Sequence, residues 1–274
     1  MAMEPKDENK LLGEVLEQVS GQLRSSLSNI YRSLERIAPP ELRDQEDGLD
    51  NDAAILCQSY YRILRLTNNL SDAAQLDRPL RPKLRNDDIV GFCRAVMERA
   101  RVPAELLGLA LEFRCAKSSH IIAIDRDRLE RMMLNLLSNA FKFTPKGGRI
   151  TLEVRIEAQR VELRLTDTGC GIAPELLETV FDRYLHTERV DPPPHGLGLG
   201  LPICRRIAQE HEGSLLLTSR PGEGTTVTVS LPNRKVKYQE LNSFIVDYSG
   251  GFNRTLLELS DALPKQAFTQ KYLD

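Results

Sequence analysis

The sequence predicts an α+β protein in which a helical hairpin is followed by a sandwich of one β-sheet and the helices that cover it. Three observations carry this prediction. Up to Ala73, apolar residues recur at steps of three and four, the period of an amphipathic helix. Further along, apolar residues alternate with polar ones, the period of a half-buried strand. Between the two patterns lie Pro79 and Pro82, where we expect the chain to pass from one unit to the other.

The hairpin is predicted from two apolar stripes, and Pro39 and Pro40 end the first helix. The first stripe is Leu12, Leu16, Val19, Leu23, Leu27, Ile30, Leu34 and Ile37, and the second is Leu56, Ile63, Leu66, Leu70 and Ala73. We expect residues 41–52 to form a polar connection. Each stripe is too narrow to form a core alone, so we expect a homodimer in which two hairpins form a four-helix bundle. The alternative is that both helices pack on the rest of this chain.

The second unit is expected to mix helices and strands. The predicted elements are a helix near 88–101, strands near 109–115 and 121–124, a helix over 127–141, strands over 150–156 and 161–165, further helices, and a strand over 227–231. These elements divide the chain into residues 1–78, 84–232 and a C-terminal extension, 233–274. A short helix is predicted at 254–263, and we expect it to pack on its own domain, with a docking surface for a partner as the alternative.

Composition excludes several classes of function. The chain has 274 residues, of which 41% are hydrophobic, and a net charge of −2, so it offers no basic surface for nucleic acid. Its five cysteines have neither the spacing of a zinc site nor an even number, which favours reduced thiols and a cytoplasmic location. No apolar run approaches the roughly 20 residues that span a bilayer, so we expect no membrane segment in this chain.

Four motifs follow one another in the second unit. They are Asn135-Leu136-Leu137-Ser138-Asn139-Ala140-Phe141-Lys142-Phe143-Thr144, Asp167-Thr168-Gly169-Cys170-Gly171-Ile172, Val180-Phe181-Asp182-Arg183-Tyr184 and Gly196-Leu197-Gly198-Leu199-Gly200-Leu201. This set resembles the N, G1, F and G2 boxes of the ATP-binding domain shared by histidine kinases, gyrase and a heat-shock chaperone. The resemblance covers about residues 87–232. It implies a Bergerat-type α/β sandwich, the sensor histidine kinase family of two-component signalling, and ATP and Mg²⁺ as ligands.

The residues of the long helix suit the phosphate end of a nucleotide. Asn135 and Asn139 are four positions apart and Lys142 follows three later, so the three project from one side of the helix. An amide oxygen is a hard, neutral ligand that suits Mg²⁺, and we assign the metal to Asn139. Lys142 would bring positive charge to the phosphates. Asn139 and Lys142 are therefore the candidate catalytic residues.

The other motifs supply the base end and further phosphate contacts. The resemblance implies that Asp167 accepts a hydrogen bond from the adenine amino group, and glycines beside it would let the base approach the backbone. The glycine run opens a helix whose N-terminus favours phosphate oxygens. The segment between Phe181 and Gly196 is expected to act as a lid. The candidate nucleotide-binding residues are Asn135, Asn139, Lys142, Phe143, Asp167, Gly169, Gly171, Ile172, Phe181, Gly196, Leu197, Gly198, Leu199, Gly200 and Leu201.

The first helix resembles the phosphoacceptor helix of the same family, where a histidine followed by an acid is expected. Gly21 and Gln22 stand in those places, and the first histidine of the chain is His120. Glycine has no nucleophile, and glutamine does not take up a proton as a carboxylate does. Self-phosphorylation at this position is therefore not expected.

Two hypotheses on function follow. In the first, an enzyme transfers the γ-phosphoryl group to a histidine, or to a serine, on another protein, such as a response regulator or a partner kinase. In the second, a pseudokinase or interaction module binds nucleotide, closes its lid and changes its contact with a partner without transfer. Two departures from the family pattern, His186 and Leu197, weaken γ-phosphate handling. Asn135 replaces the glutamate that activates water in the hydrolysing relatives, so efficient ATP hydrolysis is not expected.

Overall fold

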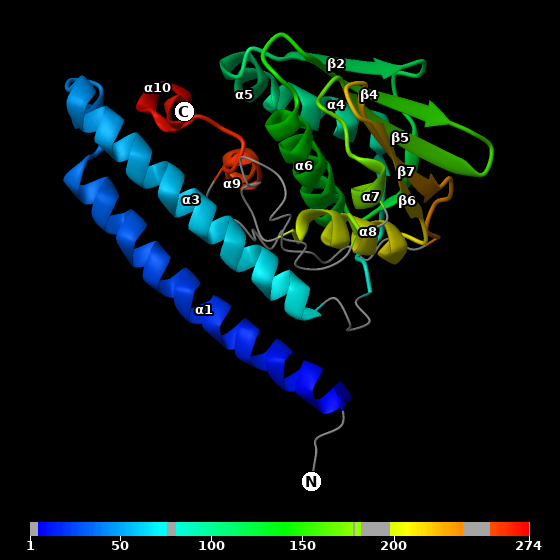
Figure 1. The fold of residues 1–274 in the computed structure, drawn as a ribbon, viewed down its shortest axis with the longest axis horizontal. Helices are drawn as coiled ribbons and strands as arrows, with labels where there is room; N and C mark the ends of the chain where they lie inside the picture. Colours follow the sequence, from blue (N-terminus) through cyan, green and yellow to red (C-terminus); the bar gives the residue numbers. More distant parts are fainter. Residues whose placement is uncertain (1–4, 76–80, 178, 182–197, 238–252, 274) are drawn as a thin grey trace.

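The computed structural model describes residues 5–75, 81–177, 179–181, 198–237 and 253–273, and it shows a long helical hairpin beside a helix-covered sheet (Figure 1). The elements are α1 Pro5–Ile37, α2 Pro40–Arg43, α3 Asp47–Gln75, β1 Arg85–Asp88, α4 Ile89–Arg99, α5 Arg101–Leu106, β2 Ala110–Cys115, β3 Ile121–Ile124, α6 Arg126–Phe143, β4 Arg149–Ile156, β5 Arg160–Asp167, α7 Pro174–Leu177, α8 Gly200–Glu210, β6 Ser214–Arg220, β7 Gly224–Pro232, α9 Arg254–Leu259, the 3₁₀ helix η1 Lys265–Phe268, and α10 Gln270–Leu273. The α+β class predicted from the sequence is confirmed.

The two long helices of the hairpin lie side by side (Figure 1). α1 ends at Ile37, just before Pro39 and Pro40, because proline lacks the N–H that a continuing helix needs. α2 covers residues 41–43 and α3 begins at Asp47, so most of the stretch expected as a connection is helical. Acidic residues in its first turn, Asp47 and Asp50, favour that early start through the helix dipole.

The hairpin has one uncovered apolar face. Of the twelve described members of the two predicted stripes, six are exposed, namely Val19, Leu23, Ile30, Ile37, Leu56 and Ile63, while Leu27 and Ala73 are buried and the other four are half-buried. α3 has a second, buried stripe that the sequence analysis did not consider: Ala53, Ala54, Cys57, Tyr60, Tyr61 and Leu64. One side of α3 thus packs on the rest of the chain, as in the alternative, while half of the described residues expected at a dimer interface are exposed. Among the described residues, no helix has the length and apolar character that a bilayer crossing requires.

The main sheet has five strands in the order β2-β4-β5-β7-β6, with β2 and β4 parallel and the other neighbours antiparallel. In the β4–β5 register, Leu152 lies opposite Leu165 and Val154 opposite Leu163, so one face of the sheet is apolar. The sequence analysis missed β1, which pairs with β3, and the edge strand β6. In β6, three consecutive leucines replace the alternation on which strand prediction depends.

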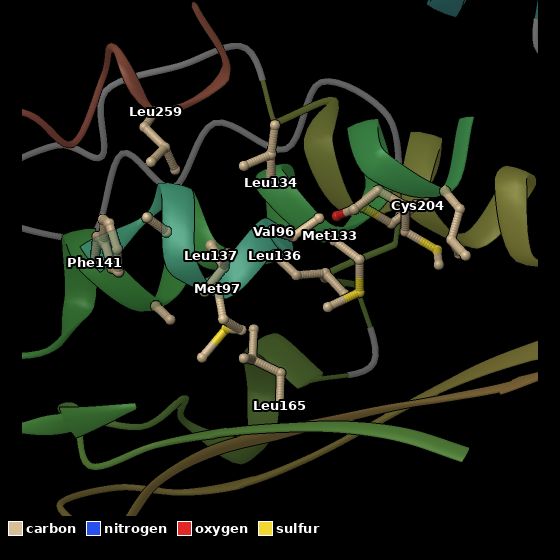
Figure 2. Close-up of a cluster of buried hydrophobic side chains, with 14 of the residues drawn as sticks. Val96, Met97, Met133, Leu134, Leu136, Leu137, Phe141, Leu165, Cys204 and Leu259 are labelled. Carbon is tan, nitrogen blue, oxygen red and sulfur yellow. The ribbon is translucent and has the colours of Figure 1, made fainter. Parts of the chain in front are cut away.

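α6 is the central helix of the core. It begins after Asp125, whose Oδ1 accepts a hydrogen bond from the Arg128 N–H at 3.3 Å and caps the helix. Figure 2 shows Leu165 of the sheet on one side of α6 and Leu259 of α9 on the opposite side. α4 and α8 also pack against α6. Because several elements cover it, most of its side chains are buried.

The C-terminal segment, residues 253–273, lies between α3 and α6. The Asn253 Oδ1 accepts a hydrogen bond from the Leu256 N–H at 3.1 Å and caps α9, which ends at Leu259, four residues short of the predicted end. The Phe268 side chain is fully buried, and its ring centroid lies 5.5 Å from that of Tyr61. The tail therefore packs on its own chain, as expected, but it contacts the hairpin as well as the sandwich.

Candidate functional site

The loop after β5 directly follows Asp167, the residue expected at the base end of the site. Asp167 is the last residue of β5, and its Oδ1 accepts hydrogen bonds from the N–H groups of Gly169 at 2.8 Å and Thr225 at 3.2 Å. Burial raises the pKa of the Asp167 carboxyl above its usual value, against the lowering effect of these two bonds. Within the described part of the chain, both bonds go to Oδ1. The second oxygen, Oδ2, can therefore accept a hydrogen bond from a ligand.

The glycines of this loop are required by the protein's own backbone. Gly171 has φ of 70°, and a Cβ atom on it would lie 2.0 Å from the Arg220 carbonyl oxygen. A Cβ atom on Gly169 would lie 2.5 Å from the Phe143 carbonyl oxygen. The sequence analysis assigned these glycines to the approach of a base, whereas the structure shows that internal packing already demands them.

The residues expected at the phosphate end lie on α6. The Asn135 side chain is 1% exposed, and its Oδ1 accepts a hydrogen bond from Arg65 Nη2 of α3 at 2.9 Å. Arg65 Nη1 also donates to Ser138 Oγ at 3.0 Å. One turn further along, Lys142 Nζ lies 3.3 Å from Asp261 Oδ2 of the C-terminal segment. Asn139 is half-buried. The side of α6 on which Asn135 and Lys142 lie thus faces α3 at Asn135 and the C-terminal segment at Lys142.

The start of α8 meets α6 at Asn135. A Cβ atom placed on Gly200, the first residue of α8, would lie 3.6 Å from Asn135 Oδ1. Leu199, the N-cap residue of this helix, makes no side-chain capping hydrogen bond, and Pro202 sits in the first turn, where its missing N–H costs little. Gly198 has φ of 67°, a conformation that favours glycine. The N box and the described part of the G2 box are therefore neighbours.

The remaining candidate residues are distributed around these two ends. Phe143 is 43% exposed, and its carbonyl accepts a hydrogen bond from the Cys170 N–H at 3.1 Å, which ties the N box to the G1 loop. The Ile172 N–H donates to Ser219 Oγ at 2.9 Å. The Arg205 guanidinium carbon lies over the Phe181 ring, 5.3 Å from the ring centroid. Leu201 packs on the core. Gly196, Leu197 and the expected lid at 182–195 lie outside the described residues.

Sequence reasoning missed four residues at this site. Thr225 supports Asp167 from the neighbouring strand β7, and Ser138 belongs to the quoted N box without having been chosen. Arg65 belongs to α3, and Asp261 belongs to the C-terminal segment. The feature of the sequence that could have predicted their presence is the second apolar stripe of α3, because it indicates that this helix packs against something besides its hairpin partner.

Gly21 lies in the interior of α1, where the side chain position is exposed. A Cβ atom on Gly21 would have no atom within 4 Å. Packing therefore does not demand glycine here, and a histidine side chain has room to extend from this position.

The donor and acceptor set fits a magnesium nucleotide. Asn135 Nδ2 is buried and has no hydrogen-bond partner among the described residues, so a donor is available beside the uncapped start of α8. Asn139 offers an amide oxygen for Mg²⁺, and Lys142 offers a cation for phosphate oxygens. Asp167 offers an acceptor at the opposite, base end.

Comparisons with known proteins agree with this geometry. Residues 124–235 match the family described as Histidine kinase-, DNA gyrase B-, and HSP90-like ATPase. Sensor protein SrrB of Staphylococcus aureus (strain NCTC 8325 / PS 47) is 31% identical over 221 residues, which are 80% of this chain and 38% of that protein. The crystal structure of full-length ShkA in complex with AMPPNP has a TM-score of 0.66 at 26% identity and covers 83% of this chain and 47% of that one. The Acinetobacter baumannii histidine kinase AdeS, with a TM-score of 0.52 at 18% identity over 73% of this chain and 98% of its own, is similar in fold.

Proposed function

Because the chain belongs to the sensor histidine kinase family, we propose that it binds ATP with Mg²⁺ between the Asp167 loop and α6. The observation that carries this proposal is the proximity of Asn135 to Gly200, where an added Cβ atom would lie 3.6 Å from Asn135 Oδ1, because it brings together two motifs that are far apart in the sequence. An uncapped helix N-terminus beside buried amides is an environment that favours phosphate oxygens.

Each candidate residue has a defined part in this proposal. Asp167 accepts a hydrogen bond from the adenine amino group, and Asn139 holds Mg²⁺. Lys142 and the N–H groups at the start of α8 neutralise the phosphates. When bound, Mg²⁺ lowers the charge repulsion that opposes attack on the γ-phosphoryl group. These residues bind and orient the nucleotide, which is the main contribution a protein makes to phosphoryl transfer.

The acceptor of the phosphoryl group is proposed to lie on another protein. Gly21 offers no nucleophile, so a histidine of a partner, or a response regulator downstream of one, is the chemically suited target. The exposed apolar stripe of the hairpin supports a homodimer with a four-helix bundle, since a second copy would bury Val19, Leu23 and Ile30.

A second candidate function is nucleotide binding without transfer. The observation that favours it is the ion pair between Lys142 and Asp261, which engages the phosphate end with the chain's own carboxylate. In this case, nucleotide changes how the hairpin contacts a partner.

Incubation with γ-labelled ATP, together with calorimetric nucleotide titration, tests the proposal. We expect the wild type to bind Mg–ATP and to carry no label on α1, and the double variant Gly21→His, Gln22→Glu to acquire label there. Gly48→His is the matched control, because Gly48 is also an exposed helical glycine with no atom near an added Cβ.

Label on α1 of the wild type would contradict the missing-acceptor argument. Binding by all three proteins with label on none would favour the non-catalytic function. An absence of nucleotide binding would overturn both functions.

A further inference from the structure

A buried cluster of opposite charges lies where α3, α6 and the C-terminal segment meet. Asp261 Oδ2 bridges two cations, with Arg65 Nη1 at 2.9 Å and Lys142 Nζ at 3.3 Å. Glu258 lies 3.7 Å from both Arg65 and Arg131. The Arg65, Glu258 and Asp261 side chains are 10% exposed or less, so these charges are largely removed from water. Buried charges in this setting require partners.

Two cations of this cluster are also connected to the proposed ATP site. Lys142 is a proposed phosphate ligand, and Arg65 holds the Oδ1 atom of Asn135, the residue beside the start of α8. Asp261 therefore places its carboxylate where an anionic ligand of Lys142 would lie. A carboxylate and a phosphate at the same lysine repel each other strongly when water is excluded.

The charge balance of the cluster depends on the C-terminal segment. With the segment docked, the cations Arg65, Arg131 and Lys142 face the carboxylates of Asp72, Glu258 and Asp261. Without the segment, Glu258 and Asp261 leave this cluster, and Asp72 is the one of these three carboxylates that remains. That surplus of positive charge suits the phosphates of a nucleotide with its Mg²⁺.

The segment is docked along α3 by contacts that do not involve the phosphate end. Gln58 Nε2 donates to the Leu263 carbonyl at 2.7 Å, and Arg62 Nε donates to the Ser260 carbonyl at 3.2 Å. Near the other end, Arg43 Nη2 donates to the Phe268 carbonyl at 2.9 Å. The segment thus packs on the hairpin through these contacts, and its docking couples the hairpin to the ATP site.

We propose that the C-terminal segment is an intramolecular lock on the ATP site, in which Asp261 holds Lys142 and Arg65 and competes with the phosphates of Mg–ATP; this inference rests on the proposed function. Nucleotide and docked segment exclude each other at Lys142. By linkage, ATP weakens the docking of the segment by the same factor by which the segment weakens ATP binding. Release of the segment uncovers the buried stripe of α3, so the state of the ATP site is transmitted to the hairpin.

Calorimetric titration of Mg–ATP into the full chain tests the lock with three variants. Asp261→Asn keeps the shape and removes the charge, and we expect it to bind Mg–ATP about tenfold more tightly than the wild type. Asp72→Asn is the matched control, because Asp72 pairs with Arg131 at the same α3–α6 boundary without touching Lys142. We expect its affinity to stay within about twofold of the wild type. Phe268→Ala, which loosens docking far from the nucleotide, should shift the affinity in the same direction as Asp261→Asn.

The outcomes separate the lock from the proposed function. If the wild type binds Mg–ATP and Asp261→Asn binds it equally or more weakly, the lock is overturned and nucleotide binding stands. Equal tightening by Asp261→Asn and Asp72→Asn would also overturn it, since a general loosening of the boundary would explain both. If none of the proteins binds Mg–ATP, the proposed function fails and the lock fails with it. Should Asp261→Asn not fold, Phe268→Ala is judged by the same criteria.

Discussion

The two ends of the candidate nucleotide site are held in different ways. At the base end, Asp167 is fixed by backbone N–H groups from its own loop and from the neighbouring strand β7, all within the sandwich. At the phosphate end, Asn135 and Lys142 contact Arg65 from the hairpin and Asp261 from the C-terminal segment. The base end is therefore preformed locally, whereas the phosphate end depends on elements that come from both ends of the chain.

This difference between the two ends indicates where regulation can act. A site held by short-range backbone contacts changes only if the domain unfolds, but a site held by remote side chains changes when those elements move. Substitutions at the base end should therefore affect the stability of the domain or the affinity for the base. Substitutions at the phosphate end should affect the competition between ATP and the C-terminal segment.

The largest effect is expected at Gly171. We expect Gly171→Ala to lower the free energy of unfolding by about 3 kcal/mol or more, because it combines a left-handed conformation with a collision against the Arg220 carbonyl. Gly222→Ala is the control, since Gly222 also has a positive φ, 77°, but no atom within 4 Å of an added Cβ. Its expected cost is about 1–2 kcal/mol. Urea denaturation measures both, and equal losses would show that the base end is not rigidly packed.

A smaller effect is expected for recognition of the base. Asp167→Asn should weaken Mg–ATP binding about 10- to 100-fold, because a hydrogen bond to a carboxylate is replaced by a mismatched amide. Glu223→Gln, an exposed neighbour in the β6–β7 turn, should leave affinity within about twofold. Calorimetry with ATP measures the change. An unchanged affinity in Asp167→Asn would count against the assignment of the base end.

The smallest effect concerns stability without ligand. Burial raises the pKa of Asp167 in the folded protein, so the folded state binds its proton more tightly than the unfolded state does. The contribution of Asp167 to stability therefore falls as the pH rises from the usual Asp pKa of about 4 through the raised pKa of the folded state. Asp167→Asn lacks this loss, so at pH 7 we expect it to melt at the same temperature as the wild type or slightly higher. Thermal melts at pH 7 and below pH 4 measure the difference, and a variant that melts several degrees below the wild type at pH 7 would contradict the expectation.

The sequence predicted what depends on local pattern. The helical hairpin, the strands around Leu152 and Leu163, and the boundaries of α6 follow from apolar period and from caps, and these were confirmed within a few residues. The strand β6 was missed because its run of leucines carries no alternation.

The long-range contacts could not be predicted in the same way. The pairing of Arg65 with Asn135 and with Asp261 joins parts of the chain 70 and 196 residues apart. No local period specifies which helix face a distant segment will cover. The second apolar stripe on α3 showed only that something would cover it. At the base end the Asp167 loop was predicted from its motif but the support from Thr225 was missed, and the phosphate end was only half predictable.

Hydrogen–deuterium exchange of the wild type with two ligands tests the contrast between the two ends most directly. Adenosine engages only the base end, whereas Mg–ATP engages both. We predict that adenosine slows exchange in the loop after Asp167 and leaves residues 254–263 unchanged, while Mg–ATP also speeds exchange in residues 254–263 because it displaces Asp261 from Lys142. Protection of residues 254–263 that stays unchanged or increases with bound Mg–ATP would contradict the account.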